Sequence, residues 1–89
     1  MFTGLVEMTA ELVGRKRAGK AGKLMLKMHR DFPEPVLGES VAVNGCCLTL
    51  ESAAGGVFTF HTLAETLDKT NLESIVPGGL VNIERAMKA

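Results

Sequence analysis

A cysteine and a threonine two residues apart are the side chains of this sequence with the clearest chemical potential. They lie in the stretch VNGCCLTL. In a β-strand, side chains alternate between two faces, so Cys47 and Thr49 share one face. The other face carries the apolar side chains of Cys46, Leu48 and Leu50. This pattern predicts a thiol and a hydroxyl on one surface, with the Asn-Gly pair before them bending the chain. The alternative is a strand whose small side chains pack under a loop, because a free cysteine is usually a buried apolar residue.

The two cysteines are neighbours in the chain, which limits what they can do together. Adjacent Cα atoms lie about 3.8 Å apart across a trans peptide, which is too close for an unstrained disulfide. We therefore expect two free thiols in a reducing compartment, and a cytoplasmic location. His29 and His61 lie far apart in the sequence, with no CxxC or HxxxH pattern beside them. No metal site is predicted.

The composition favours one small globular domain. Residues 1–89 are enough for a single domain, and a hydrophobic content of 46% supplies its core. Ten basic residues balance ten acidic ones, which argues against an electrostatic grip on nucleic acid or on an anionic membrane surface. No apolar run approaches the length of a membrane span, and the first residues do not open a secretory signal. We expect neither nucleic acid nor a membrane as a partner.

Short strands separated by turn signals are predicted along most of the chain. Alternating apolar residues indicate strands over residues 2–14, 23–29, 40–52, 57–62 and 80–86, with Val6, Met8, Ala10 and Leu12 on one face of the first. The stretch RKRAGKAG is interpreted as a solvated hairpin loop. A phosphate-binding loop is the alternative, but no strand-loop-helix context supports it.

Three further stretches connect or follow the strands. Residues 31–39 contain two prolines and a glycine, which predicts a connection without regular structure. Leucines four residues apart within 63–68 predict one or two helical turns, with Thr62 as the cap and Glu65 as its capping-box partner. Residues 70–75 are expected to be irregular or a short strand. Together these elements predict an all-β antiparallel barrel, and the pattern alone does not choose between an OB-type, an SH3-like and a Greek-key barrel.

Several motifs resemble riboflavin synthase, the enzyme that makes riboflavin from a lumazine. The opening MFTGLVE and the stretch VNGCCLT carry the resemblance, and ET, TNL and VNIERA further along fall where that family has similar segments. The resemblance covers nearly the whole chain. It implies a six-stranded antiparallel Greek-key closed barrel with one short helix. Because chains of that family carry two such barrels, residues 1–89 resemble the N-terminal, lumazine- and riboflavin-binding half of a two-barrel enzyme.

The resemblance also implies a reaction. Two molecules of 6,7-dimethyl-8-ribityllumazine dismutate, and one gives a four-carbon unit to the other. The products are riboflavin and 5-amino-6-ribitylamino-pyrimidinedione, with no metal or organic cofactor. Such chemistry depends on holding two rings face to face while one loses a methyl proton. In the family each active site lies between the N-barrel of one subunit and the C-barrel of another, so one barrel alone is expected to bind ligand with little or no turnover.

Matching the family's contacts onto this sequence implies candidate site residues. The catalytic candidates are Cys47, Phe2 and Ser40. The thiol or thiolate of Cys47 would relay a proton or assist addition, and Phe2 would close the site. Free backbone N–H groups at the helix start would add to the binding. The family usually has an acidic residue in place of His61, which leaves open what that side chain does. The implied ligand contacts are Gly4, Leu5, Val6, Cys47, Leu48, Thr49, His61, Thr62, Leu63, Ala64, Glu65 and Thr66.

Two other classes of function remain open. One is a non-catalytic flavin or lumazine carrier, against which the cysteine motif argues. The other is a small barrel that binds nucleic acid or protein, against which zero net charge and four phenylalanines without tryptophan or tyrosine argue. A lone N-barrel would leave an apolar rim around Val6, Cys47 and Leu63 in water. We therefore expect a homodimer that buries this rim, with Phe2 near the contact and one flavin per chain.

Overall fold

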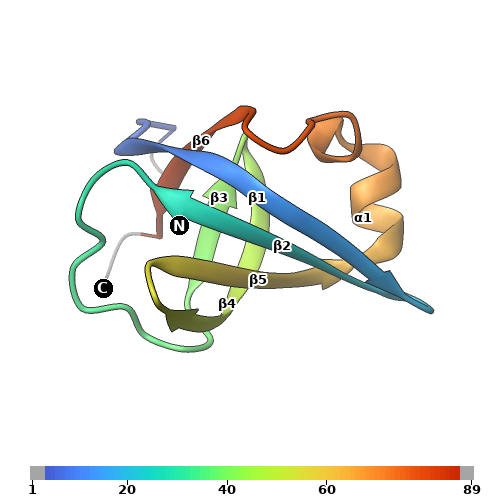
Figure 1. Cartoon of the computed structure of the whole chain (residues 1–89), viewed down its shortest axis with the longest axis horizontal. Coiled ribbons are helices and arrows are strands. Elements are labelled where there is room, and N and C mark those ends of the chain that lie inside the picture. The colour runs from blue at the N-terminus through green and yellow to red at the C-terminus, as the bar shows by residue number, and fades with distance from the viewer. Residues whose placement is uncertain (1–3, 87–89) are drawn as a thin grey trace.

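Within residues 4–86, which are the residues described in the computed structural model, six antiparallel strands close into a barrel (Figure 1). The order around the barrel is β1-β2-β5-β4-β3-β6. The predicted all-β closed barrel with one short helix is confirmed. The elements are β1 (Met8–Ala18), β2 (Ala21–Met28), β3 (Ser40–Val43), β4 (Cys46–Ala54), β5 (Val57–Leu63), α1 (Ala64–Lys69), the 3-10 helix η1 (Asn71–Glu73) and β6 (Leu80–Arg85).

The strand order is that of a Greek key. β3, β4 and β5 follow one another as hairpins, and β2 lies beside β5 rather than beside β3. Residues 29–39, which include the predicted connection without regular structure at 31–39, carry the chain from β2 to β3. Closure pairs β6 with both β1 and β3, so the sheet presents no free edge. In the described part of the chain no helix has the length and apolar character needed to cross a membrane.

The basic stretch 15–22 is not the loop that the sequence predicted. Most of it belongs to β1 and β2, which pair directly up to Ala18 and Ala21 and turn at residues 19–20. The polar side chains of this stretch point outward into water. They therefore do not prevent the backbone from pairing in the strand ladder. A bulge between Leu12 and Gly14 lets the long strand bend around the barrel.

Residues 40–52 form a hairpin rather than the single kinked strand predicted from the sequence. Asn44 and Gly45 have φ values of +50° and +80°, which suits a two-residue turn of the kind that joins antiparallel strands. The turn is fixed to β6, because the Asn44 side chain accepts a hydrogen bond from the backbone N–H of Asn82 at 2.7 Å. The stretch that carries Cys47 and Thr49 therefore begins directly after a turn that is bound to β6.

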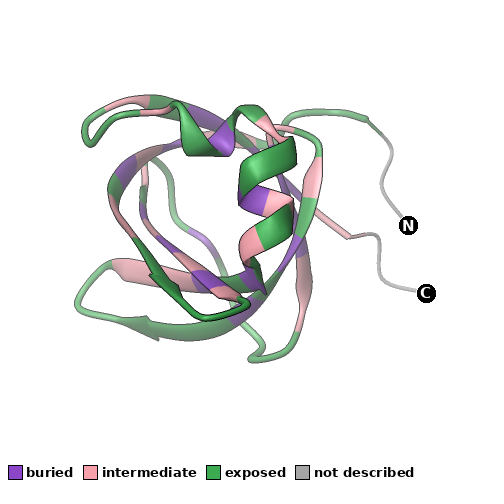
Figure 2. Ribbon diagram, turned by 90° about the vertical axis from the view of Figure 1, so that its right-hand side faces the viewer, coloured by how far each residue is buried: buried purple, intermediate pink, exposed green. Residues whose placement is uncertain are grey.

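Buried residues recur along the strands of the barrel (Figure 2), and their side chains form one apolar cluster inside it. Phe60 and Leu26 are fully buried, and the predicted inward residues Val81 and Ile83 are confirmed. Val6 departs from the prediction: it precedes β1, which begins at Met8, and it is 54% exposed. The segment before β1 therefore runs outside the barrel and does not extend its core.

The short helix α1 lies in front of one end of the barrel (Figure 2) and inserts Leu67, which is fully buried. The predicted capping box is wrong: Leu63 occupies the N-cap position without a side-chain hydrogen bond. Thr62 remains in β5 and is buried, while Glu65 forms an ion pair with Lys69. Packing of Leu67 into the barrel end, rather than a cap, accounts for the position of this helix.

Candidate functional site

The outer face of β4 presents the thiol and the hydroxyl that the sequence predicted. Cys47, Thr49 and Glu51 are exposed, whereas Leu48 is 1% exposed and belongs to the core. The alternative in which Cys47 is packed under a loop is wrong. Because the side chain of Leu48 points into the barrel, only its backbone can reach a ligand on the outer face.

Strand pairing places three predicted site residues in one line across the barrel wall. Thr49 lies opposite Ser40 of β3 on one side and opposite His61 of β5 on the other. Directly paired residues point to the same face, and neighbouring strands are about 4.8 Å apart. Two hydroxyls and an imidazole therefore project from one outer surface. Lys23 of β2, which lies opposite His61, continues the line.

A second line of paired residues connects Cys47 with the segment before β1. Cys47 lies opposite Ala42, and Ala42 lies opposite Glu84 of β6. The Glu84 carboxylate accepts from the backbone N–H of Gly4, at 3.1 Å to Oε1 and 3.0 Å to Oε2. Gly4 has a φ of +83°, which glycine adopts without strain. Segment 4–6 is exposed and lies within two strands of the thiol.

The junction of β5 and α1 brings further predicted residues to this surface, with two exceptions. Leu63 follows His61 by two residues and is 55% exposed on the same outer face. Thr62 is buried, so its side chain does not join the surface as predicted. The backbone N–H of Ala64 donates to the carbonyl of Lys20 at 2.8 Å, so it is not the free donor expected at the helix start.

The two thiols differ in their environment. Burial raises the pKa of Cys46 above its ordinary value, and the neighbouring Cys47 raises it further. Cys46 therefore stays a neutral thiol, packed against the core, and Cys47 is the cysteine available for chemistry.

Phe2, the third catalytic candidate, lies outside the described residues. Among residues 4–86 no three His, Cys, Asp or Glu side chains gather closely enough to hold a metal ion.

Two hollows in the outer surface include predicted site residues. A groove of about 520 Å³ has Gly4 and Val6 on one side and the Asn44 turn on the other, with Asn82 and Glu84 of β6 between them. A hollow of about 320 Å³ includes Leu63, Ala64 and Glu65. Neither of these two hollows is lined by Cys47, Thr49 or His61.

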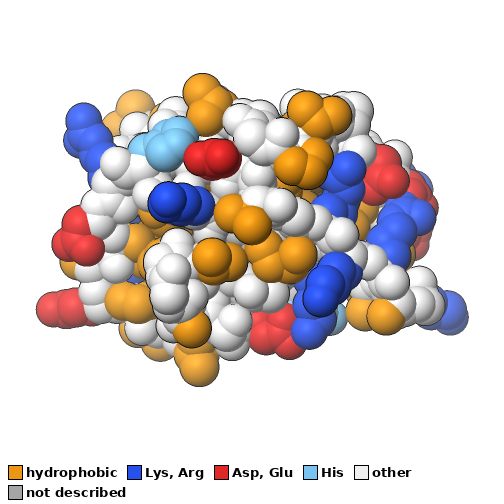
Figure 3. Space-filling view, in the orientation of Figure 1, with side chains coloured by type: hydrophobic (Ala, Val, Ile, Leu, Met, Phe, Trp, Pro, Cys, Tyr) orange, Lys and Arg blue, Asp and Glu red, His pale blue; other side chains and the backbone are white. Residues whose placement is uncertain are grey.

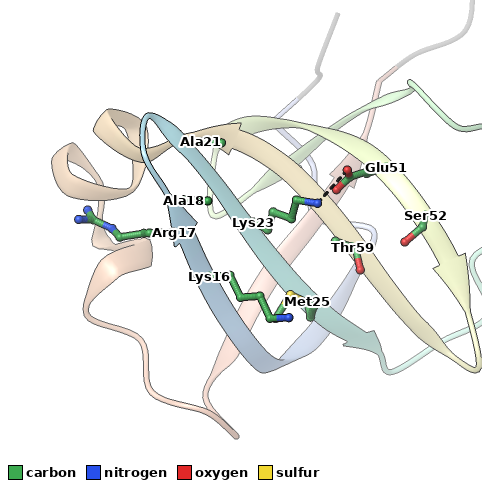
Figure 4. Close-up of a pocket in the computed structure, with 9 residues that line it drawn as sticks. All are labelled: Lys16, Arg17, Ala18, Ala21, Lys23, Met25, Glu51, Ser52 and Thr59. Carbon is green, nitrogen blue, oxygen red and sulfur yellow. Dashed lines mark hydrogen bonds and ion pairs between the residues drawn. The ribbon is translucent and has the colours of Figure 1, made fainter.

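A larger hollow of about 590 Å³ lies on β1, β2, β4 and β5 and contains none of the predicted site residues (Figure 4). Lys23 forms an ion pair with Glu51 at 3.0 Å across it. Arg17 points away from the hollow (Figure 4) and pairs with Asp68 and Glu73. On this side of the molecule, lysine and arginine side chains gather toward the end where the β1–β2 hairpin lies (Figure 3). Two of the three cationic side chains that line this hollow, Arg17 and Lys23, are already in ion pairs. The size of the hollow alone therefore does not make it the ligand-binding site.

Glu84 is the site-forming residue that sequence reasoning missed. It appears there only as a letter of the motif VNIERA. Alternation along β6 sends its side chain outward, yet it is only 8% exposed. The signal that reveals it is long-range: segment 4–6 folds back over β6, and no periodicity in the sequence predicts that.

Comparison with known proteins identifies relatives of the whole chain. The lumazine binding domain family matches residues 3–86. Riboflavin synthase of Bacillus subtilis (strain 168) is 40% identical over 89 residues, which are all of this chain and 41% of that protein. Riboflavin synthase of Escherichia coli (strain K12) is 40% identical over 94 residues, covering 99% of this chain and 42% of that protein. The chain therefore spans about two fifths of the length of these relatives.

Solved structures with the same fold include two of LumP. One is a complex with 6,7-dimethyl-8-(1'-D-ribityl) lumazine, at a TM-score of 0.84 and 24% identity, covering 99% of this chain and 49% of the other. The second is a complex with flavin mononucleotide, at a TM-score of 0.82 and 22% identity, covering 100% of this chain and 54% of the other. At these identities the likeness establishes the barrel fold.

Proposed function

We propose, because this chain belongs to the lumazine-binding domain family, that it binds 6,7-dimethyl-8-ribityllumazine and riboflavin on the outer face of β3, β4 and β5. The observation that carries the proposal is the gathering of Ser40, Cys47, Thr49 and His61 on one exposed surface beside segment 4–6. A flat ring fits against the small side chains around Cys47. A ribityl chain needs hydrogen-bonding partners, and the neighbouring hydroxyls and imidazole offer them.

The proposed reaction is that of riboflavin synthase, of which this chain would be the N-terminal barrel. One lumazine gives a four-carbon unit to another, and the products are riboflavin and the ribitylamino-pyrimidinedione. One barrel face holds one lumazine, so the second must be brought by another barrel. Cys47 is the group we assign to proton relay or addition, with Ser40 beside the ring and Phe2 closing the site. We expect the isolated domain to have little or no turnover.

A homodimer is the proposed form of the isolated domain. Val6 and Leu63 are 54% and 55% exposed beside the thiol, and burying such apolar surface favours association. A symmetric pair would use the same patch on both chains. Light scattering with riboflavin present should report a dimer for the unmodified chain and a monomer for the Val6→Asp, Leu63→Asp double variant. A monomeric unmodified chain, or a dimer unaffected by the substitutions, would refute this arrangement.

The alternative proposal is a non-catalytic lumazine or flavin carrier, and the ligands bound in the two LumP complexes are compatible with either proposal. The higher identity to riboflavin synthases favours the enzyme. Both proposals predict binding, and they differ in turnover. If the chain is the N-terminal barrel of the enzyme, it should convert the lumazine once a second barrel is added to the assay. If the chain is a carrier, it should bind the lumazine without converting it.

Binding is tested by titrating riboflavin with the purified chain and following the quenching of its fluorescence. Saturable quenching at micromolar protein is expected, with about one flavin per chain. A Ser52→Ala variant serves as a control, because Ser52 lines the larger hollow and not the proposed site. No saturable quenching at high micromolar protein would refute the proposed function. Turnover by the chain alone at the rate of a two-barrel enzyme would refute the expectation that a second barrel is needed.

A further inference from the structure

A buried carboxylate lies at the edge of the proposed binding face. Glu84 is 8% exposed although it projects from the outer side of β6. Removing a carboxylate from water is costly unless hydrogen bonds replace its hydration. Both of its oxygens lie within hydrogen-bonding distance of one donor, the backbone N–H of Gly4, at 3.0 and 3.1 Å. Hydrogen bonds to an ionised acceptor are roughly twice as strong as neutral ones.

The segment that Glu84 holds keeps most of its side-chain surface in water. Its side chains contribute little burial, because Leu5 is 71% and Val6 54% exposed. The ladder with β6 begins only at Glu7, whose N–H donates to the carbonyl of Ile83 at 2.9 Å. The described segment therefore leaves the sheet at residue 7 and returns over β6 at Gly4. The carboxylate lies at the point of return.

The register of the sheet relates this anchor to the binding face. Glu84 lies opposite Ala42, which lies opposite Cys47. Strand spacing puts the carboxylate about 10 Å from the thiol-bearing strand position. Gly4, fixed to Glu84, borders the 520 Å³ groove on this side. The peptide groups of residues 4–6 are thereby directed to the same region as the thiol.

We propose that Glu84 is a positioning residue that fixes the backbone of residues 4–6 against the ligand, and so sets affinity without contacting the ligand. This inference rests on the proposed function. It goes beyond it by assigning a role to a residue outside the predicted contacts. It also predicts that the loss of affinity on removing the carboxylate accompanies the loss of the hydrogen bond to the Gly4 N–H.

The test uses two variants of Glu84 in the full chain. Glu84→Ala removes the acceptor of the Gly4 N–H, whereas Glu84→Gln removes the charge but keeps an acceptor oxygen. Glu84→Ala should weaken riboflavin binding about tenfold. Glu84→Gln should weaken it less, because a hydrogen bond to a neutral acceptor is roughly half as strong as one to an ionised acceptor. The matched control is Glu34→Gln, which changes an exposed carboxylate of the connection 29–39 and should leave the affinity unchanged.

A second measurement separates this inference from the proposed function. In the ligand-free chain, the amide proton of Gly4 should show the NMR shift and exchange protection of a hydrogen-bonded group, and Glu84→Ala should abolish both. If riboflavin does not bind at all while this NMR result holds, the proposed function fails and the anchor remains. Unchanged affinity in Glu84→Ala would overturn the inference. If Glu84→Ala does not fold, Glu84→Gln decides, and an affinity equal to that of the unmodified chain would then overturn it.

Discussion

Two segments without regular structure lie outside the barrel wall, and neighbouring residues of β6 hold them. Segment 4–6 is held by Glu84 through one backbone N–H. Segment 29–39, which connects β2 to β3, is held by Arg85. Segment 4–6 borders the proposed ligand site and segment 29–39 does not. Comparing the two segments therefore separates contacts that affect ligand binding from contacts that affect stability.

The attachment through Arg85 combines an ion pair, a hydrogen bond to a backbone carbonyl and a contact with an aromatic ring. Its guanidinium makes a two-pronged pair with Glu39, at 3.0 Å for both contacts. It also donates to the carbonyl of Pro33 at 2.6 Å and lies 4.0 Å from the centre of the Phe32 ring. Phe32 itself is 4% exposed and packs with the core. Segment 29–39 therefore buries apolar surface and charge together, whereas segment 4–6 leaves its side chains in water.

The comparison predicts its largest effect for Arg85→Ala. Removing one partner of a largely buried ion pair leaves Glu39 uncompensated, so the free energy of unfolding should fall by about 3 kcal/mol. The Tm should fall by more than about 10 °C, while riboflavin affinity of the folded protein stays within a factor of about two. Thermal melts and titrations below the transition measure both quantities. Arg30→Ala, at an exposed position of the same segment, is the control and should have no effect on Tm.

A second prediction concerns α1, which combines both roles because it buries Leu67 and carries site residues. A Cβ at Gly22 would lie 2.7 Å from Cδ1 of Leu67. Gly22→Ala should therefore displace the helix, lower stability by about 2 kcal/mol and weaken riboflavin binding as well. Gly14→Ala is the matched control, since its Cβ meets only the flexible end of Met25 at 3.0 Å. Equal stability of the two variants in urea denaturation would show that α1 does not depend on this contact.

A third prediction compares the proposed site with the larger hollow. Thr49→Val removes one hydroxyl from the proposed site with little change of shape, and Thr59→Val does the same in the hollow. The first should weaken riboflavin about fivefold, because a lost hydrogen bond costs about 1 kcal/mol, and the second should leave the affinity unchanged. Neither should change the Tm by more than about 4 °C. The reverse order of affinities would move the site to the hollow.

The smallest predicted effect is a dependence of stability on alkaline pH. Burial raises the pKa of Cys46 above its ordinary value of 9.0. A raised thiol pKa stabilises the fold fully at pH values below the pKa of the unfolded chain, and this contribution is lost as the pH rises through the folded-state value. Urea denaturation at about pH 8 and about pH 10.5 should show this loss for the unmodified chain. The loss should be smaller in Cys46→Ala, and an equal pH dependence in both chains would contradict the assignment to Cys46.

Much of the barrel was predictable because strand alternation is a local property. The inward residues of β2, β4 and β6 follow from a period of two, and so does the exposure of Cys47 and Thr49. The Asn-Gly pair carried a turn signal that was interpreted as a bend, although two consecutive positive φ values make it a hairpin. The basic end of β1 was missed because ladder pairing to β2 depends on the partner strand and not on polarity.

The remaining features depend on contacts between distant parts of the chain. The capping box at Thr62 failed because that residue is buried in β5, and the position of α1 depends on Leu67 in the barrel end. Glu84 and Gly4 are 80 positions apart and meet only because the barrel closes between β1 and β6. Periodicity therefore predicted which residues share the outer face of the barrel. It did not predict which distant segments lie against that face.

The most direct test of the proposed site is a riboflavin titration of the isotopically labelled chain followed by backbone amide NMR. We predict that the amides with the largest saturable shifts are those of residues 4–6, 47–49 and 63–66, which come together only in the folded barrel. Residues of the larger hollow, such as Lys16 and Met25, should move little. Saturable shifts confined to residues 16–25 and 51–59, or no saturable shift at high micromolar riboflavin, would contradict the proposed binding face.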